Sequence, residues 1–160
     1  MTRQEIITGL KNYFCIEELV DKLVFDKYGE KAWMFFDTDL LHTIWIIRKH
    51  LDKSITINNW KWGGKFDERG LRYNLNYIVK QKTIAGKMYL SMHLFGKAID
   101  FDVEGMTAEE VRDWIVDNSN LFRCKIRLEW KYSKTGKPIT WVHLDTRAED
   151  KNPKVYRFNI

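Results

Sequence analysis

Residues 91–103, SMHLFGKAIDFDV, are the most informative stretch of the sequence for the fold. The second half of this stretch alternates in polarity, which is typical of a β-strand with one buried face. His93 precedes Asp100 by seven residues, and Gly96 between them can bend the backbone. The stretch therefore predicts a bend followed by a strand, and His93 and Asp100 are candidate metal ligands.

A β-hairpin is predicted further along the chain, because residues 126–132 and 139–145 also alternate in polarity. Between them lies the tripeptide Lys-Thr-Gly, which ends at Gly136. A three-residue hairpin loop favours a left-handed residue at that position, and glycine adopts this conformation without strain. We therefore expect two antiparallel strands joined at this loop.

The loop also predicts which side chains of the hairpin meet. In the expected register Arg127 lies opposite His143, and Glu129 lies opposite Trp141. Because side chains alternate between the faces of a strand, these four residues share one face, with Glu129 diagonal to His143. A second imidazole and a carboxylate are thus expected on the same side of the sheet.

Two imidazoles and one carboxylate suit a zinc ion whose fourth position is open to water. Such a site lowers the pKa of its water to about 7 and polarises a carbonyl group. His93, Asp100 and His143 are the candidate ligands, and Glu129 is the candidate general base. On spacing alone, a hydrogen-bonded histidine and a surface aspartate are the favoured explanation of the first pair, because isolated histidine pairs are seldom metal ligands.

The first fifty residues are predicted to be helical. One apolar face recurs at helical spacing before Gly29, formed by Ile16, Leu19, Val20, Leu23 and Val24. A second helix is expected after Asp37 or Thr38. A third is expected after Thr107, because Glu110 completes a capping box with it.

Between the helical regions, residues 54–57 alternate like a short strand, whereas residues 58–83 have neither helical nor strand periodicity. Such a long aperiodic segment is uncommon in a compact domain and is often functional. Cys15 and Cys124 stand far apart in the sequence. They indicate neither a disulfide framework nor a cysteine zinc site.

The length of 160 residues and the apolar content of 44% suit one domain with a sizeable core. No apolar run reaches the ~18 residues of a membrane-spanning helix. Residues 1–5, MTRQE, lack the build of a secretory signal, so we expect synthesis in a cytoplasm. The net charge of +5 favours anionic partners such as nucleic acid, a membrane surface or a wall polymer. No basic helix or known motif supports nucleic acid among them.

Two motifs together resemble those of the zinc D-alanyl-D-alanine carboxypeptidase family, whose relatives include phage L-alanyl-D-glutamate endolysins and the hedgehog signalling domain. The motifs are S-x-H-x-x-G-x-A-x-D at residues 91–100 and W-V-H-x-D at residues 141–145. The stretch at residues 58–72 and the Arg-Leu-Glu at residues 127–129 resemble the bacteriophage members most. The resemblance implies that zinc is bound by His93, Asp100 and His143.

The resemblance also suggests roles for neighbouring residues. Ser91 is expected either to support the loop through a hydrogen bond or to cap a turn. Many relatives have their catalytic acid three residues before the last histidine, but Thr140 occupies that place here. Phage members have a glutamate on the preceding strand, which matches Glu129. Asp145 is the second candidate for the base, or it orients His143 from outside the ligand set.

An upstream arginine in relatives binds the substrate carboxylate or polarises its carbonyl, and Arg72 resembles it more than Arg69 does. A structural salt bridge is the alternative role for this arginine. Peptidoglycan stem peptides are the implied substrate. The protein would act at the cell wall after release by a holin, or as part of a virion beside other phage proteins.

The expected architecture is α+β, with a small antiparallel sheet that carries the zinc site on one face and helices on the other. Within one domain, residues 1–53 are expected to form a helical N-terminal part, residues 54–147 the peptidase-like core and residues 148–160 a tail. The alternative to an enzyme is a non-catalytic zinc-binding virion protein that serves assembly or wall attachment.

Overall fold

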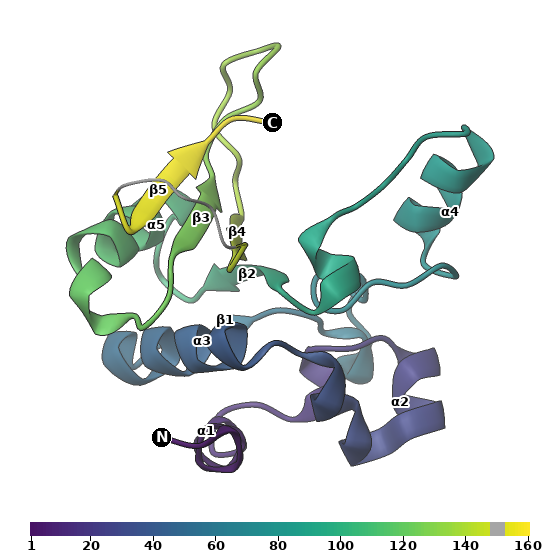
Figure 1. The fold of residues 1–160 in the computed structure, drawn as a ribbon, viewed down its shortest axis with the longest axis horizontal. Coiled ribbons are helices and arrows are strands. Elements are labelled where there is room, and N and C mark those ends of the chain that lie inside the picture. Colours follow the sequence, from purple (N-terminus) through teal and green to yellow (C-terminus); the bar gives the residue numbers. More distant parts are fainter. Residues whose placement is uncertain (148–152) are drawn as a thin grey trace.

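A computed structural model describes residues 1–147 and 153–160 and shows an α+β fold (Figure 1). Five strands form one sheet in the order β1-β2-β4-β3-β5. Neighbouring strands run antiparallel, except that β5 is parallel to β3. The strands are β1 (Ile55–Thr56), β2 (Ala98–Val103), β3 (Ile126–Glu129), β4 (Val142–Asp145) and β5 (Val155–Phe158).

Five α-helices accompany the sheet in the described residues. They are α1 (Arg3–Leu10), α2 (Lys22–Tyr28), α3 (Thr38–Leu51), α4 (Tyr77–Ile84) and α5 (Ala108–Asp117). Short 3-10 turns are η1 (Ile16–Glu18), η2 (Gly29–Phe35), η3 (Trp60–Trp62), η4 (Met92–Phe95) and η5 (Ser119–Leu121). In Figure 1, α3 lies between α1 and the sheet, whereas α4 stands apart from it.

Alternation along the central strands separates a core face from a polar face. Ile99, Phe101, Leu128 and Leu144 belong to one apolar cluster with residues of α3 and α5. The polar residues that alternate with them point to the other face, where Asp100 and His143 are paired across β2 and β4. The polar face therefore carries the candidate site, opposite the apolar cluster.

The helical N-terminal third differs in detail from the prediction. The expected single helix over residues 16–28 is wrong, because η1 and α2 are separate elements. Asp21 caps α2 by accepting a hydrogen bond from the Val24 amide at 2.9 Å, which starts a new helix there. Leu23, expected on the buried face, is 59% exposed. Of the two residues predicted to cap α3, Asp37 and Thr38, the structure has Asp37 as the N-cap.

The hairpin register is a second correction. Gly136 is left-handed as expected, with φ 64°. However, Arg127 pairs with Asp145 rather than with His143. Near the loop Lys131 pairs with Pro138, so between this pair and Arg127–Asp145 the second strand has three more residues than the first, and residues 139–141 form a bulge before β4. Within β3 and β4 the pairing is therefore two residues from the expected one, so Arg127, Glu129 and His143 still share one face.

Two elements lie where none was expected. The helix α4 occupies part of the segment predicted to lack periodicity. The strand β5 lies in the predicted tail, of which residues 148–152 fall outside the described residues. Both cysteines are half-buried free thiols. In the described residues, no helix has the length and apolar character needed to cross a membrane.

Candidate metal centre

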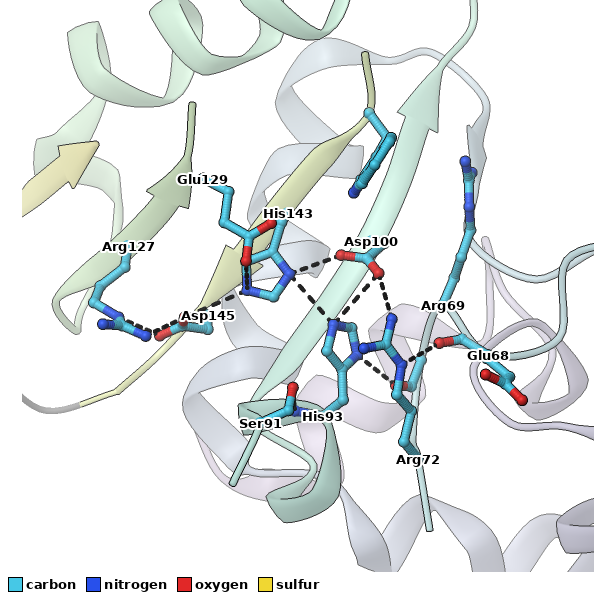
Figure 2. A network of polar contacts seen from close by, with 12 residues as sticks. Glu68, Arg69, Arg72, Ser91, His93, Asp100, Arg127, Glu129, His143 and Asp145 are labelled. Atoms are coloured by element: carbon cyan, nitrogen blue, oxygen red, sulfur yellow. Dashed lines mark hydrogen bonds and ion pairs between the residues drawn. The ribbon is translucent and has the colours of Figure 1, made fainter. Parts of the chain in front are cut away.

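His93, Asp100 and His143 form a buried group on the polar face of the sheet (Figure 2). His93 Nε2 and His143 Nδ1 are 3.3 Å apart. The Asp100 carboxylate contacts both rings, with Oδ1 2.7 Å from His143 Nδ1 and Oδ2 3.4 Å from His93 Nε2. One donor atom from each residue lies within 4.8 Å of the other two. The two motifs, far apart in sequence, therefore converge in space.

The spacing of these donor atoms suits a tetrahedral metal ion. Nitrogen ligands at about 2.0–2.1 Å from zinc are separated from each other by about 3.3 Å in tetrahedral geometry. The observed separation of His93 Nε2 and His143 Nδ1 is 3.3 Å. Two imidazoles and a carboxylate accept several divalent metals, so the group could hold a metal ion without its donors identifying which.

Local backbone structure places His93. Ser91 is the N-cap of η4, and its Oγ accepts a hydrogen bond from the His93 amide at 3.4 Å. Gly96 ends η4 with φ 61°, and a Cβ there would lie 2.0 Å from the Phe35 carbonyl oxygen. This close approach requires glycine and turns the chain directly into β2.

The segment that precedes α4 supports the group through its backbone. The Gly70 carbonyl oxygen lies 2.7 Å from His93 Nδ1 and fixes that nitrogen as the donor, which leaves Nε2 as a ligand atom. The Arg69 carbonyl accepts from the Asp100 amide at 2.8 Å, and the Arg72 amide donates to the His93 carbonyl at 3.1 Å. Sequence reasoning missed the Gly70 contact, because a backbone carbonyl that accepts a hydrogen bond has no residue-type signal.

The other nitrogen of His143 faces two carboxylates. Its Nε2 is 3.4 Å from Asp145 Oδ2 and 3.7 Å from Glu129 Oε1. Arg127 binds Asp145 through two hydrogen bonds, from Nε to Oδ1 at 2.9 Å and from Nη2 to Oδ2 at 2.8 Å. Asp145 therefore contacts both Arg127 and His143. Glu129 forms its ion pair with the His143 ring.

Arg72 is fully engaged beside the group. Its Nη2 donates to Asp100 Oδ2 at 2.8 Å, its Nη1 to the Tyr89 hydroxyl at 3.0 Å, and its Nε to the Glu68 carbonyl at 2.7 Å. This is the salt bridge that the sequence left as the alternative. Arg69 instead pairs with Asp102 at 2.5 Å and does not reach the group.

Charge and burial shift the pKa values of the three residues in different directions. Burial lowers the pKa of His93 despite the nearby Asp100 carboxylate. Burial also disfavours charge on His143, but hydrogen bonds to Asp100 and Asp145 outweigh it and raise its pKa to about 10. Burial opposes ionisation of Asp100, but both imidazoles hold its pKa well below the usual range.

The two neighbouring carboxyl groups also differ. Burial raises the pKa of Glu129, although the positive charge of His143 opposes the shift. Burial opposes ionisation of Asp145 as well, but hydrogen bonds from His143 and Arg127 lower its pKa to about 2. Glu129 is therefore the stronger proton acceptor of the two, and Asp145 stays ionised.

Two hollows border the group. One, of about 470 Å³, is lined by Asp100, Arg72, Trp141 and Tyr77 among others. The second, of about 250 Å³, is lined by residues that include Ser91, Glu129, His143 and Asp145. Each hollow thus reaches one of the candidate ligands, and a bound molecule can approach the group from either side.

Arg112 is a further residue that sequence reasoning missed. Its side chain on α5 is fully buried, and its Nη2 donates to the carbonyls of Ile139 at 2.8 Å and Trp141 at 2.6 Å. These carbonyls belong to the bulge that precedes His143. Arg112 therefore fixes the bulge and, through it, the position of His143 on β4.

In comparisons with known proteins, no family model, curated protein or solved structure matches the chain. The structure itself establishes an α+β fold with a buried His-Asp-His group that could hold a metal ion. Any functional assignment therefore depends on this geometry and on the motifs that supply its residues.

Proposed function

We propose that the protein is a zinc-dependent peptidase that hydrolyses an amide bond in peptidoglycan stem peptides. It would resemble the zinc D-alanyl-D-alanine carboxypeptidases and the phage endolysins. The observation that carries the proposal is the 3.3 Å separation of His93 Nε2 and His143 Nδ1 beside the Asp100 carboxylate. The same residues are the ones that the two sequence motifs assign to zinc.

In this proposal each residue around the group has a separate task. Zinc, when bound, supplies Lewis acidity for attack of water on an amide carbonyl. Glu129 accepts a proton from that water and returns it to the leaving amine, a role that its raised pKa favours. Ser91 holds the backbone of η4, and Asp145 orients the His143 ring.

Arg72 would act at the larger hollow. Its guanidinium holds the Asp100 carboxylate and also lines this hollow, where a substrate carboxylate or a developing oxyanion can meet its positive charge. Its three hydrogen bonds give it a fixed position, so binding there requires no reorganisation of the side chain. Trp141 lines the same hollow and offers an apolar wall.

The biological setting is proposed from the same resemblance. The protein would open the bacterial wall during phage lysis or entry, and it would reach the wall through a holin or as part of a virion. The net charge of +5 supports a loose attraction to an anionic wall.

The test is incubation of the zinc-loaded protein with intact peptidoglycan from several wall types, followed by mass analysis of the products. We expect new amino and carboxyl termini, which His143→Ala abolishes together with zinc binding. Glu129→Gln should keep zinc and lose most of the activity, by about 10²–10⁴-fold for a general base. His50→Ala, on the exposed end of α3, is the matched control and should behave like the unchanged protein.

Two observations favour the non-catalytic alternative. Thr140 stands where many relatives have their acid, and Glu129 contacts His143 at Nε2 rather than at the ligand nitrogen. A zinc-binding virion component would bind the metal stoichiometrically and release no new termini from any wall. That result would refute the peptidase proposal, and full activity of Glu129→Gln would remove Glu129 from the role of base.

A further inference from the structure

The segment around α4, residues 75–90, is an exposed projection that we call the arm (Figure 1). Residues 80–88 are all exposed, and within the arm only Asn76 and Val79 are buried. The arm stands apart from the sheet and its covering helices in Figure 1. The arm therefore contributes little to the core, and packing does not explain why it contains large apolar side chains.

Large apolar side chains of the arm face water. Tyr77 is 70% exposed, Ile84 79%, Met88 87% and Leu90 60%. Apolar residues scattered singly on a surface are ordinary, but these four lie within one short projecting segment, which indicates a site of interaction. Gly86, left-handed at φ 63°, lies between Ile84 and Met88 in open space and turns the chain at the end of α4.

The charge of the arm has one sign. Lys80, Lys82 and Lys87 are exposed beside the apolar side chains. The sequence has no aspartate or glutamate between Arg69 and Ile99. The arm thus combines exposed apolar groups with uncompensated positive charge.

This combination distinguishes between possible partners. Protein interfaces are depleted in lysine, whereas anionic membranes attract it at about 1 kcal/mol per residue near the surface. A polyanion such as nucleic acid or a wall polymer would be held by the lysines but would gain nothing from exposed isoleucine and methionine. A bilayer uses both, since apolar side chains enter the headgroup region while lysines contact anionic lipids. We propose that the arm binds the surface of an anionic phospholipid bilayer.

The base of the arm is tied to the candidate metal centre. Glu68 accepts hydrogen bonds from the amides of Tyr77 and Ile78 at the start of α4. At the other end the Tyr89 hydroxyl accepts from Arg72, which also holds Asp100. Tyr77 lines the larger hollow beside Asp100. An arm bound to a bilayer therefore brings this hollow close to the membrane surface. Membrane binding itself does not depend on peptidase activity.

The test measures sedimentation of the full chain with vesicles made of equal parts phosphatidylglycerol and phosphatidylcholine, beside vesicles of phosphatidylcholine alone. We expect binding to the anionic vesicles that weakens at high salt. Replacing Lys80, Lys82 and Lys87 by glutamine should weaken it on the order of a hundredfold. Replacing Ile84 and Met88 by serine should weaken it by roughly tenfold or more, since their apolar area no longer leaves water.

A matched control changes similar residues elsewhere. Leu23 and Met34 are each 59% exposed, so their replacement by serine should leave vesicle binding unchanged. Thermal unfolding and zinc binding of every variant establish that it is folded. The proposal is overturned if the anionic vesicles bind no protein, or if the arm variants bind them as well as the unchanged protein does. It is also overturned if the arm variants lose only self-association or binding to wall polymer.

Discussion

Arg127 holds Asp145 with two parallel hydrogen bonds, at 2.9 and 2.8 Å, and Asp145 in turn lies 3.4 Å from His143 Nε2. The pair is nearly buried, with side-chain exposures of 11% and 1%. A guanidinium that binds both carboxylate oxygens fixes the orientation of the carboxylate as well as its charge. Arg127 therefore acts on the candidate metal centre through another residue, as a positioning residue.

Arg127→Leu should weaken zinc binding by about 10–100-fold, because Asp145 loses the contact that directs it toward His143. The zinc affinity of Arg127→Lys should lie between those of Arg127→Leu and the unchanged protein, since a lysine keeps the charge but cannot bind both oxygens. Competition with a chromophoric chelator measures the affinities. Arg123→Leu is the control, because Arg123 pairs with the half-exposed Asp39 far from the group. Equal zinc affinity in Arg127→Leu and the unchanged protein would contradict the positioning role.

Zinc binding should depend on pH through His143. Its pKa, raised to about 10, means that the metal-free protein keeps a proton that zinc must displace at Nδ1. His93 has a lowered pKa and Asp100 a pKa below its usual range, so near neutral pH His93 is neutral, with its one proton on Nδ1, and Asp100 is ionised; neither has to lose a proton to bind zinc. We expect release of one proton per zinc ion, and an apparent affinity that rises about tenfold per pH unit from about pH 7 to 9.

Calorimetry in buffers of different ionisation enthalpy counts the released protons directly. Affinity that stays constant over this range would mean that His143 is already neutral in the metal-free protein. Asp145→Asn removes one of the carboxylates that raise the pKa of His143. In this variant the pH dependence should therefore begin to level off at a lower pH than in the unchanged protein.

The candidate ligands could be predicted from the sequence because local patterns determine their placement. Strand alternation puts Asp100 and His143 on one face, and the glycine at position 96 permits the turn that carries His93. To predict that the three candidate ligands meet, it was therefore enough to assign the correct face of each strand and the correct neighbouring strands. A register error of two residues changed neither, since side chains repeat every second residue.

The parts of the fold that the sequence did not predict depend on contacts between residues far apart in the chain. The hairpin loop alone gives no sign of the bulge at residues 139–141, which is held by Arg112 from α5. The break between η1 and α2 is caused by the N-cap at Asp21. The apolar residues before and after Asp21 keep the same helical spacing, so the sequence pattern does not show the break. The strand β5 pairs with β3 from the end of the chain, and α4 buries only Val79, too little for a visible period.

Arg112→Met should destabilise the protein by about 3–5 kcal/mol, because a buried guanidinium is lost and the carbonyls of Ile139 and Trp141 are left without their donor. Urea unfolding of the zinc-free protein measures this loss. We also expect weaker zinc binding, since the bulge leads directly to His143. Lys22→Met removes an exposed ion pair with Asp26 and should cost less than about 1 kcal/mol. An equally small cost for Arg112→Met would mean that the bulge forms without this residue.

Gly70→Ala should disturb the fold and the candidate metal centre together. A Cβ at this position would lie 1.9 Å from the Leu19 carbonyl oxygen, and backbone on both sides leaves no flexible atom to move aside. The resulting shift should cost about 1–3 kcal/mol or more in the free energy of unfolding. It should also move the Gly70 carbonyl away from His93 Nδ1, now 2.7 Å distant, and weaken zinc binding.

Gly86→Ala separates this effect from the general cost of replacing a glycine. Gly86 has φ 63° and open space around its Cα, so alanine there costs about 1–2 kcal/mol through backbone strain alone. Because Gly86 lies at the end of α4, away from the ligands, zinc affinity should not change. Unfolding and zinc titration of both variants give the comparison. If Gly70→Ala lowers stability but keeps full zinc affinity, the Gly70 carbonyl does not orient the His93 ring.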